Sequence, residues 1–361
     1  MILNKNKVVV GLSGGVDSTA AAYLLKKQGY EVVGVTMILF YEYDKKGSII
    51  EPQFVKDAKR VAKILNIPHY VVEYCQMFES TVKKEFVEEY LKGRTPNPCL
   101  TCNKIIKYGK LIEIAQSLEA YYVATGHYAN IHYDDKLNRY RIYRGRAERK
   151  DQAYLLYFLR QEQLKHLILP LGNYHSKEEV REIATKVDPK IGEKTDSTDI
   201  CFVPDGDHIS YLKSVSKIAS IKGDFVDISG KILGEHIGIV SYTIGQRRGL
   251  GKDFGKPMYV VDIDIEKNQV ILGNDEHTYS RGLIAKNANF TIYHELKEEV
   301  KAKAQICQWG LFLPVAISNL GHGKIKVMFH KSERAVAPGQ AVVFYHGNEV
   351  IGGATIESVI K

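Results

Sequence analysis

The sequence predicts an α/β protein with a doubly wound parallel sheet, followed by a small central mixed domain and a C-terminal domain resembling a β-barrel. Three observations predict this architecture. Strand-like runs alternate with amphipathic helices over residues 1–207, which is typical of a parallel sheet covered on both faces. A glycine turn joins the first strand to the first helix. Residues 282–361 are almost wholly strand-like, so we expect domains at 1–207, 208–281 and 282–361.

In the first domain, β-branched runs indicate strands, and apolar residues spaced three and four apart indicate helices. The expected strands are 7–12, 30–39, 69–73 and 121–125. The expected helices are 19–28, 55–65, 81–92, 105–117 and 151–169, and a capping box opens another over 176–186. Later strands are expected within 223–240, within 257–272 around a turn at 266–268, at 324–330, and at 341–349 with a turn at Gly347-Asn348.

Composition limits the class of protein. The chain is 45% hydrophobic and 25% charged, which excludes collagen-like, disordered and coiled-coil proteins. Lys and Arg outnumber Asp and Glu by 50 to 42, a moderate surplus that permits a polyanionic partner. No apolar run approaches the ~20 residues of a bilayer span, and the start lacks the pattern of a signal peptide. We therefore expect a cytoplasmic protein with no membrane or DNA partner.

A glycine loop follows the first strand and reads Gly11-Leu12-Ser13-Gly14-Gly15-Val16-Asp17-Ser18. Backbone N–H groups at the start of a helix attract phosphate, and two glycines let the chain approach an anion closely. Asp17 would repel phosphate unless a Mg²⁺ ion bridged the two, so we expect magnesium there. The loop lacks Gly-Lys-Ser/Thr and Gly-x-Gly-x-x-Gly, which argues against a Walker loop and against a dinucleotide site.

Five cysteines are too few for a disulfide scaffold and suggest buried thiols, metal ligands or catalysis. Pro96 and Pro98 interrupt any earlier helix, so we expect Cys102 at the N-terminus of the helix over 105–117. That position, with Lys104 and Lys107 nearby, would lower the pKa of the Cys102 thiol. Cys102 and Cys201 could then hold and transfer sulfur as a persulfide.

The cysteines permit other chemistry as well. Three thiolates, Cys99, Cys102 and Cys201, can hold a [4Fe–4S] cluster with one iron open, and this alternative remains. Zinc is disfavoured because no second Cys-x-x-Cys or pair of histidines supplies a fourth ligand. Cys75 and Cys307 are expected to be buried structural thiols.

The loop signature Ser-Gly-Gly-x-Asp-Ser resembles that of the PP-loop ATP pyrophosphatases, whose fold is like that of the adenine nucleotide α hydrolases. Further stretches make the chain similar, nearly end to end, to the tRNA-specific 2-thiouridylases. They are 94–104, 124–128, 150–152, 196–202, 242–250 and 337–340. The resemblance implies a sulfurtransferase that adenylates O2 of the wobble uridine (position 34) of tRNA with ATP and then replaces that oxygen with sulfur.

The resemblance also implies roles for individual residues. ATP phosphates bind Gly11–Ser18, Met37 and Gly126 contact the adenosine, and Asp17 positions Mg²⁺. Cys201 carries a persulfide from a donor protein, and Cys102 attacks it to leave a Cys102–Cys201 disulfide. The tRNA-contact positions are His127, Lys150, Asp151, Gln152 and Gln340. Relatives usually carry Arg and Tyr at Gln305 and Ile306, so no RNA contact is carried over to those two residues.

A basic stretch with interleaved tyrosines runs over residues 133–150, and its alternation around Tyr140 and Tyr143 predicts a hairpin. Arginines on one face could neutralise phosphates while tyrosines stack on unpaired bases of the anticodon loop. A solvated charged hairpin is the structural alternative. Two other functions fit less well: an amidotransferase synthetase would need a glutaminase domain, and a silent tRNA-binding module would not need the intact loop and cysteines.

Overall fold

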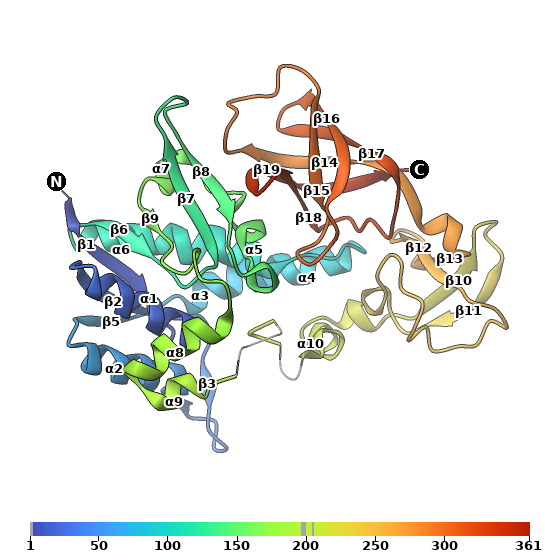
Figure 1. The fold of residues 1–361 in the computed structure, drawn as a ribbon. Coiled ribbons are helices and arrows are strands. Elements are labelled where there is room, and N and C mark those ends of the chain that lie inside the picture. Colours follow the sequence, from blue (N-terminus) through green and yellow to red (C-terminus); the bar gives the residue numbers. More distant parts are fainter. Residues whose placement is uncertain (1–2, 196–199, 204–205) are drawn as a thin grey trace.

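The computed structural model describes residues 3–195, 200–203 and 206–361 (Figure 1). Its N-terminal part is built on a five-stranded parallel sheet. In spatial order the strands are β5 (His69–Glu73), β2 (Glu31–Ile38), β1 (Asn4–Gly11), β6 (Ala120–Ala124) and β9 (Leu167–Ile168). The strand order reverses between β1 and β6, and open α/β sheets bind ligands at the carboxyl ends of the strands at such a reversal.

Helices cover both faces of this sheet, which confirms the doubly wound architecture. Along β1, Val8 and Val10 face one side and Val9 faces the other, because successive side chains of a strand alternate. The first side packs against α1 (Val16–Lys27), α2 (Gln53–Leu65), α8 (Lys177–Val187) and α9 (Pro189–Gly192). The second side packs against α6 (Leu111–Ser117) and the buried run 153–159.

The helix that carries the first two site cysteines starts earlier than expected. It begins with α5 (Pro98–Cys102), continues as a π-helical segment η2 (Asn103–Lys110) and ends with α6. Asn97 caps it, since its side-chain oxygen accepts the N–H of Cys99 at 3.1 Å. Pro98 occupies the first helical position, where its missing N–H costs nothing. Pro98 therefore begins this helix, and the expected start at residue 105 was wrong.

The expected helix over 151–169 is also wrong. The chain forms η3 (Glu148–Lys150), η4 (Ala153–Leu156) and α7 (Gln161–Leu164), and then adds β9 to the sheet. Every residue from 153 to 159 is buried, so this run has no polar face to turn toward water. Similarly, the helix expected over 81–92 begins earlier, as α3 (Cys75–Phe78), η1 (Glu79–Lys83) and α4 (Lys84–Leu91).

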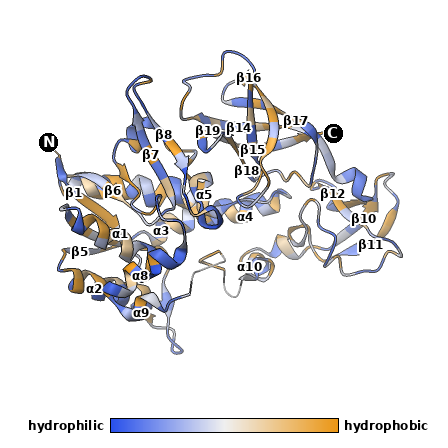
Figure 2. Ribbon diagram, in the orientation of Figure 1, coloured by the Kyte–Doolittle hydropathy of each residue, from blue (hydrophilic) through white to orange (hydrophobic). Residues whose placement is uncertain are grey.

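The C-terminal part is a closed barrel, as expected. Its strands follow the order β14 (Tyr279–Phe290), β17 (Lys324–Arg334), β16 (Leu313–Gly321), β15 (Val300–Gln305), β18 (Ala341–His346) and β19 (Glu349–Ile360), and pairing of β14 with β19 closes it. The expected hairpin is present as β7 (Ala129–Asp134) and β8 (Arg139–Arg144). It extends the barrel sheet, because β8 pairs with β19. Figure 2 shows the projecting end of this hairpin as mostly hydrophilic.

The central part is a small mixed sheet of β11 (Ile232–His236), β10 (Gly223–Asp227), β13 (Gln269–Gly273) and β12 (Tyr259–Asp264), preceded by α10 (His208–Val215). β10 and β13 are parallel and the other pairs are antiparallel. The remaining short elements are β3 (Glu42–Tyr43), β4 (Ile49–Ile50), η6 (Lys217–Ser220), η7 (Ile239–Ser241) and η8 (Asp275–Thr278). None of the helices described here is long and apolar enough to cross a bilayer.

Candidate active site

The glycine loop links the end of β1 to α1 at the point where the strand order reverses. Gly14 has a φ of +66°, and a Cβ there would lie 2.6 Å from the carbonyl oxygen of Phe54 and 2.8 Å from the nitrogen of Ala58. Only glycine fits, both for its backbone conformation and for the close approach of α2. Gly15 forms the N-cap of α1, so the first N–H groups of the helix are directed at this loop.

Hydroxyl groups hold the loop in shape. The N–H of Ser13 donates to Ser18 Oγ at 3.1 Å, the two hydroxyls lie 3.0 Å apart, and Ser18 Oγ donates to the Gly15 carbonyl at 3.2 Å. Ser13 is exposed, whereas Ser18 is buried. The loop is therefore preformed with one hydroxyl facing solvent, at a helix N-terminus suited to an anion.

Asp17 lies at the centre of this end of the sheet. The Tyr128 hydroxyl donates to its Oδ1 at 2.7 Å, and Lys177 Nζ lies 2.7 Å from both of its oxygens. Gly126 follows β6, and a Cβ there would lie 2.7 Å from Asp17 Cβ, so this position has room only for glycine. Sequence reasoning missed Lys177 and Tyr128. The capping box marked the start of the helix but not the direction of the lysine.

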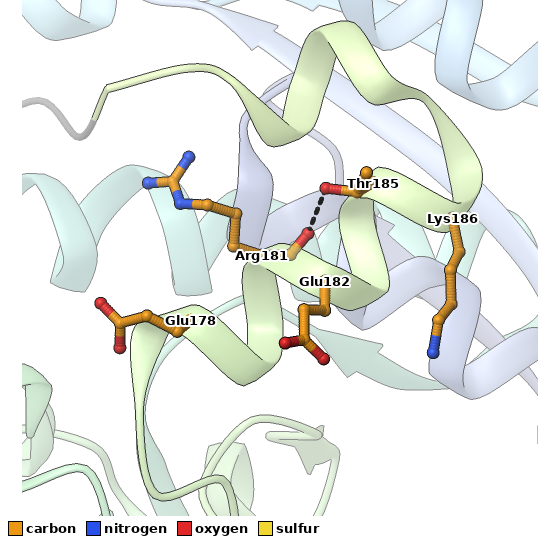
Figure 3. A pocket seen from close by; sticks show the side chains of 5 residues that line it. All are labelled: Glu178, Arg181, Glu182, Thr185 and Lys186. Carbon is orange, nitrogen blue, oxygen red and sulfur yellow. Dashed lines mark hydrogen bonds between the residues drawn. The ribbon is translucent and has the colours of Figure 1, made fainter.

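A second lysine ties the chain leading toward Cys201 to the glycine loop. Lys194 Nζ donates to the Gly14 carbonyl at 2.8 Å and to Asp57 Oδ2 at 2.5 Å. Arg181 of α8 donates to the carbonyl of Lys194 at 2.6 Å and also binds the carbonyl of Gly192. Figure 3 shows Arg181 beside Glu178, Glu182, Thr185 and Lys186, which line a hollow on α8. All these lining side chains come from one helix, so the hollow is a feature of the α8 surface.

The three predicted site cysteines lie near one another. Desolvation is the main cause of the raised pKa of Cys102 and of Cys201; the charges of Cys201 and Cys99 add to the first shift, and the charge of Cys99 adds to the second. Cys99 and Cys201 are exposed, whereas Cys102 is only 6% exposed. Cys102 and Phe202, the residue after Cys201, pack in the same buried core, so the structure brings the two cysteine stretches together. Residues 196–199 of the second cysteine stretch lie outside the described residues.

The expected lowering of the Cys102 pKa is wrong. Burial raises it to about 11, and the opposing charge of Lys107 only reduces the shift. Cys102 is the last residue of α5, inside a continuous helix, and it packs in a core with Phe86 and Phe202. Desolvation likewise raises the pKa of Cys201 although the residue is exposed, because neighbouring protein surrounds part of its side chain, and the charge of Lys107 acts in the opposite direction.

The described cysteines are all free thiols. Cys75 is buried as expected, but Cys307 is exposed, because it lies just beyond the end of β15 in a turn. Over residues 3–195, 200–203 and 206–361, no group of three or more His, Cys, Asp or Glu side chains is arranged to hold a metal ion. Among these residues, Cys99, Cys102 and Cys201 are therefore not arranged as a metal site.

Several contacts connect the thiols to the rest of the site. Met37, half-buried in β2, packs against the core that contains Cys102 as well as against the core beside β1. The loop leading into α5 is bonded to the barrel: Gln340 Nε2 donates to the Thr95 carbonyl at 2.8 Å, and the Thr95 N–H donates to the Pro338 carbonyl at 2.9 Å. The loop before the cysteine helix thus contacts the barrel, and the core around Cys102 reaches the parallel sheet through Met37.

The side chains expected to contact tRNA already have partners within the protein. His127 is buried and lies 2.9 Å from both Tyr108 Oη and Thr125 Oγ1, and burial lowers its pKa to about 3, so it is neutral. Asp151 accepts from Arg144, and Gln152 Oε1 accepts the Tyr128 N–H at 3.1 Å. Lys150 ends η3. RNA contacts by His127, Lys150, Asp151, Gln152 and Gln340 stay predictions.

The hairpin arginines do not form one basic face. Arg141 is paired with Glu349 and Asp134, and Arg144 is paired with Asp151 at 2.8 Å. Arg139 Nε donates to the carbonyl of Thr291 at 2.8 Å. Positions 139 and 141 share one side of β8 while 144 lies on the other, because side chains alternate along a strand. These arginines fasten the hairpin to the barrel and the adjoining turn.

The fold and the loop define this protein as an α/β nucleotide-binding protein of the PP-loop class. Three family descriptions match successive parts of the chain: a tRNA methyl transferase HUP domain over residues 6–205, a tRNA methyl transferase PRC-barrel domain over 210–274, and an aminomethyltransferase β-barrel domain over 280–356. The chain belongs to the family of the tRNA-specific 2-thiouridylases, which confirms the resemblance.

Relatives of known name match along the whole chain. It is 48% identical over 361 residues to tRNA-specific 2-thiouridylase MnmA 1 of Caldanaerobacter subterraneus subsp. tengcongensis, with 99% of each chain covered. It is 49% identical over 358 residues to tRNA-specific 2-thiouridylase MnmA 1 of Clostridium tetani, with 98% of each covered. Among solved structures, a 4-thiouridine synthetase–RNA complex with bound ATP is 18% identical with a TM-score of 0.37, covering 58% of this chain and 50% of that one.

Proposed function

We propose that this protein is a tRNA-uridine 2-sulfurtransferase that uses ATP to replace O2 of the wobble uridine with sulfur. The observation that carries the proposal is that the two cysteine stretches pack together, since Cys102 shares a buried core with Phe202 and Val203, which follow Cys201. Cys99 and Cys102 lie on α5, and Met37, near the carboxyl end of β2, packs against the core that contains Cys102. An activated oxygen and a sulfur nucleophile can meet there.

In this proposal the triphosphate binds the backbone N–H groups and hydroxyls of Gly11–Ser18, and the adenosine contacts Met37 and Gly126. The Asp17 carboxylate is 34% exposed, so one side of it can face a ligand while the other holds Lys177. A carboxylate, phosphate oxygens and water are the ligands that Mg²⁺ prefers, so the residues present fit the ion. Bound there, magnesium would neutralise charge on the phosphates.

The chemistry proceeds in two stages. O2 of the uridine attacks the α-phosphorus of ATP, which forms an O–P bond and releases pyrophosphate. The terminal sulfur of a persulfide on Cys201 then attacks C2, and AMP leaves with the former O2. Attack of the Cys102 thiolate on Cys201 Sγ breaks the S–S bond, frees the thiolated uridine and leaves a Cys102–Cys201 disulfide. An external dithiol must supply two electrons to restore both thiols.

The different accessibilities of the two thiols support the roles proposed for them, with Cys201 as the persulfide carrier and Cys102 as the thiol that attacks it. Cys201 is exposed, so a persulfide-bearing donor protein can reach it. Cys102 is buried, so its reaction is confined to a neighbouring group. The substrate tRNA would present its anticodon loop, and the uridine must leave the base stack to reach buried reactive groups.

The alternative uses the same three thiols to hold a [4Fe–4S] cluster. That mechanism predicts iron and a visible absorbance band in protein purified without oxygen, whereas the persulfide mechanism predicts neither. Iron analysis and an absorption spectrum of anaerobically purified protein distinguish them.

The central experiment is Cys201→Ser. We expect no 2-thiouridine in digested tRNA by liquid chromatography and mass spectrometry, while tRNA binding persists, because serine cannot carry a persulfide. Cys307→Ser is the matched control, since it removes another exposed thiol outside the site. Thiolation by Cys201→Ser at the control rate would contradict the proposal.

A further inference from the structure

Cys201 lies in a tight turn whose neighbouring residues are packed into the protein. The Val203 N–H donates to the Ile200 carbonyl at 2.9 Å, which closes the turn. Phe202 and Val203 are buried in the core that contains Cys102, and half-buried Ile200 packs against the same core. Cys201 itself is exposed. The turn therefore presents this thiol at the surface while the residues on either side of it are held.

Three aromatic rings surround the Phe202 ring, and we call these three the aromatic clamp. The ring centres lie 5.4 Å away for Phe78 of α3, 5.3 Å for Phe86 of α4 and 5.5 Å for Tyr211 of α10, and each pair meets edge to face. Aromatic pairs of this geometry attract one another beyond the effect of buried area. The Lys83 ammonium lies 5.8 Å from the centre of the Phe202 ring. Phe202 is thereby held from several sides.

One of the three rings of the aromatic clamp belongs to the central part of the protein. Tyr211 lies on α10, between the parallel-sheet part and the central sheet (Figure 1), and the next residue, Leu212, is fully buried. The core around Cys102 continues into the central sheet, where it includes Phe225 and Val260. The short helix η7 of the central part also contacts α4. The central part and the helices α3 and α4 therefore hold Phe202 jointly.

The position of Cys201 matters because a disulfide forms only when two Cβ atoms approach within about 3.5–4.5 Å. Cys102 is buried inside a continuous helix that runs from α5 into η2, so its own position is fixed. The other thiol has to be brought to it. Contacts that hold the residue next to Cys201 therefore govern how often the two sulfurs meet.

We propose that the central part of the protein takes part in sulfur transfer: Tyr211, with Phe78 and Phe86, clamps Phe202, and Phe202 is the positioning residue that keeps Cys201 within reach of Cys102. The inference rests on the proposed function, since it takes Cys201 as the sulfur carrier and Cys102 as its partner. It gives the central part a role at the thiols, which lie on and beside the parallel-sheet part.

The test is the rate at which the Cys102–Cys201 disulfide forms in Cys99→Ser protein treated with diamide. Diamide takes two electrons and two protons from the two thiols, and peptide mass spectrometry without reductant identifies the bridge. We expect Phe202→Ala and Tyr211→Ala to slow this reaction about tenfold or more, because losing a holding contact lowers the effective concentration of one thiol at the other. Tyr211→Phe keeps the ring and should remain within twofold of the parent protein.

Each oxidation rate is divided by the rates at which iodoacetamide alkylates Cys102 and Cys201 in the same variant, since greater exposure or ionisation would speed both reactions. Phe329→Ala is the matched control, because Phe329 is 8% exposed, as Phe202 is, but lies in the barrel core. It should lose stability in urea unfolding without slowing the disulfide.

Two results would overturn the inference: corrected rates of Phe202→Ala and Tyr211→Ala within twofold of the Phe329→Ala control, or no Cys102–Cys201 disulfide in the parent protein. Half-buried Tyr211 keeps the test usable if Phe202→Ala does not fold. The oxidation needs neither tRNA nor ATP, so its outcome is independent of the Cys201→Ser thiolation assay that tests the proposed function.

Discussion

Alkylation of Cys102 is expected to be slow near neutral pH and to rise about tenfold with each pH unit up to about pH 10. The reason is burial, which raises the pKa of this thiol from 9.0 to about 11. Only the thiolate reacts. At pH 8 about 0.1% of such a thiol is ionised, against about 9% of a thiol of pKa 9.0, a difference of roughly a hundredfold.

Part of that difference is recovered, because a thiolate of higher pKa is the better nucleophile. A Brønsted coefficient of about 0.45 over two pKa units gives about eightfold, so the net expectation is a rate about tenfold below that of an unperturbed thiol. Restricted access to the buried sulfur lowers the absolute rate further but leaves the slope against pH unchanged. The slope is therefore the quantity to measure.

The assay is reaction with iodoacetamide in Cys99→Ser protein, followed by peptide mass spectrometry, since Cys99 and Cys102 share the tryptic peptide 95–104. The same protein in urea is the control, and there Cys102 should titrate near its ordinary value. A rate in the folded protein that levels off below pH 9 would refute the reasoning. It would mean that Lys104 and Lys107 outweigh burial, as the sequence alone suggested.

Two further substitutions test the frame around the site. Gly126→Ala places a Cβ 2.7 Å from Asp17 Cβ, so we expect the free energy of unfolding in urea to fall by about 1–3 kcal/mol and ATP binding to weaken by calorimetry. Gly15→Ala is the stability control, because its Cβ meets only Ser13 Oγ at 3.5 Å. Equal losses of stability in the two variants would contradict the packing argument. Arg141→Met leaves buried Glu349 unpaired and should lower the free energy of unfolding by about 3 kcal/mol. Lys324→Met breaks an exposed ion pair and should lower it by less than about 1 kcal/mol. Similar losses in the two variants would show that the pair between Arg141 and Glu349 does not hold the hairpin.

Local sequence patterns predicted those parts of the fold that local interactions determine. The first four parallel strands, the glycine loop and the turn at Gly347-Asn348 have backbone and burial requirements readable within a few residues. The start of the cysteine helix could also have been read from Asn97 and Pro98, a cap followed by a proline at the first position. A helix start at residue 105 puts Cys102 at the N-terminus, whereas the structure places it inside a continuous helix and in a core, where burial raises its pKa.

What sequence could not supply is the identity of distant partners. The buried run 153–159 takes its conformation from the sheet on one side and the barrel on the other, so its own periodicity carries no signal. Lys177 and Lys194 are ordinary surface residues by pattern, yet both reach the glycine loop or its aspartate. Arg141 looked like part of a phosphate-binding strip because its carboxylate partner Glu349 lies over two hundred positions away.

The pairing of β8 with β19 means that the last strand of the chain is hydrogen-bonded to a hairpin inserted in its first half. Removing the barrel would strip β8 of its neighbour and uncover the apolar run 153–159, and a bare strand edge recruits other chains. The ATP-binding half is therefore not a separable fragment. Chimaeras that exchange C-terminal portions among relatives would have to move residues 129–159 with the barrel.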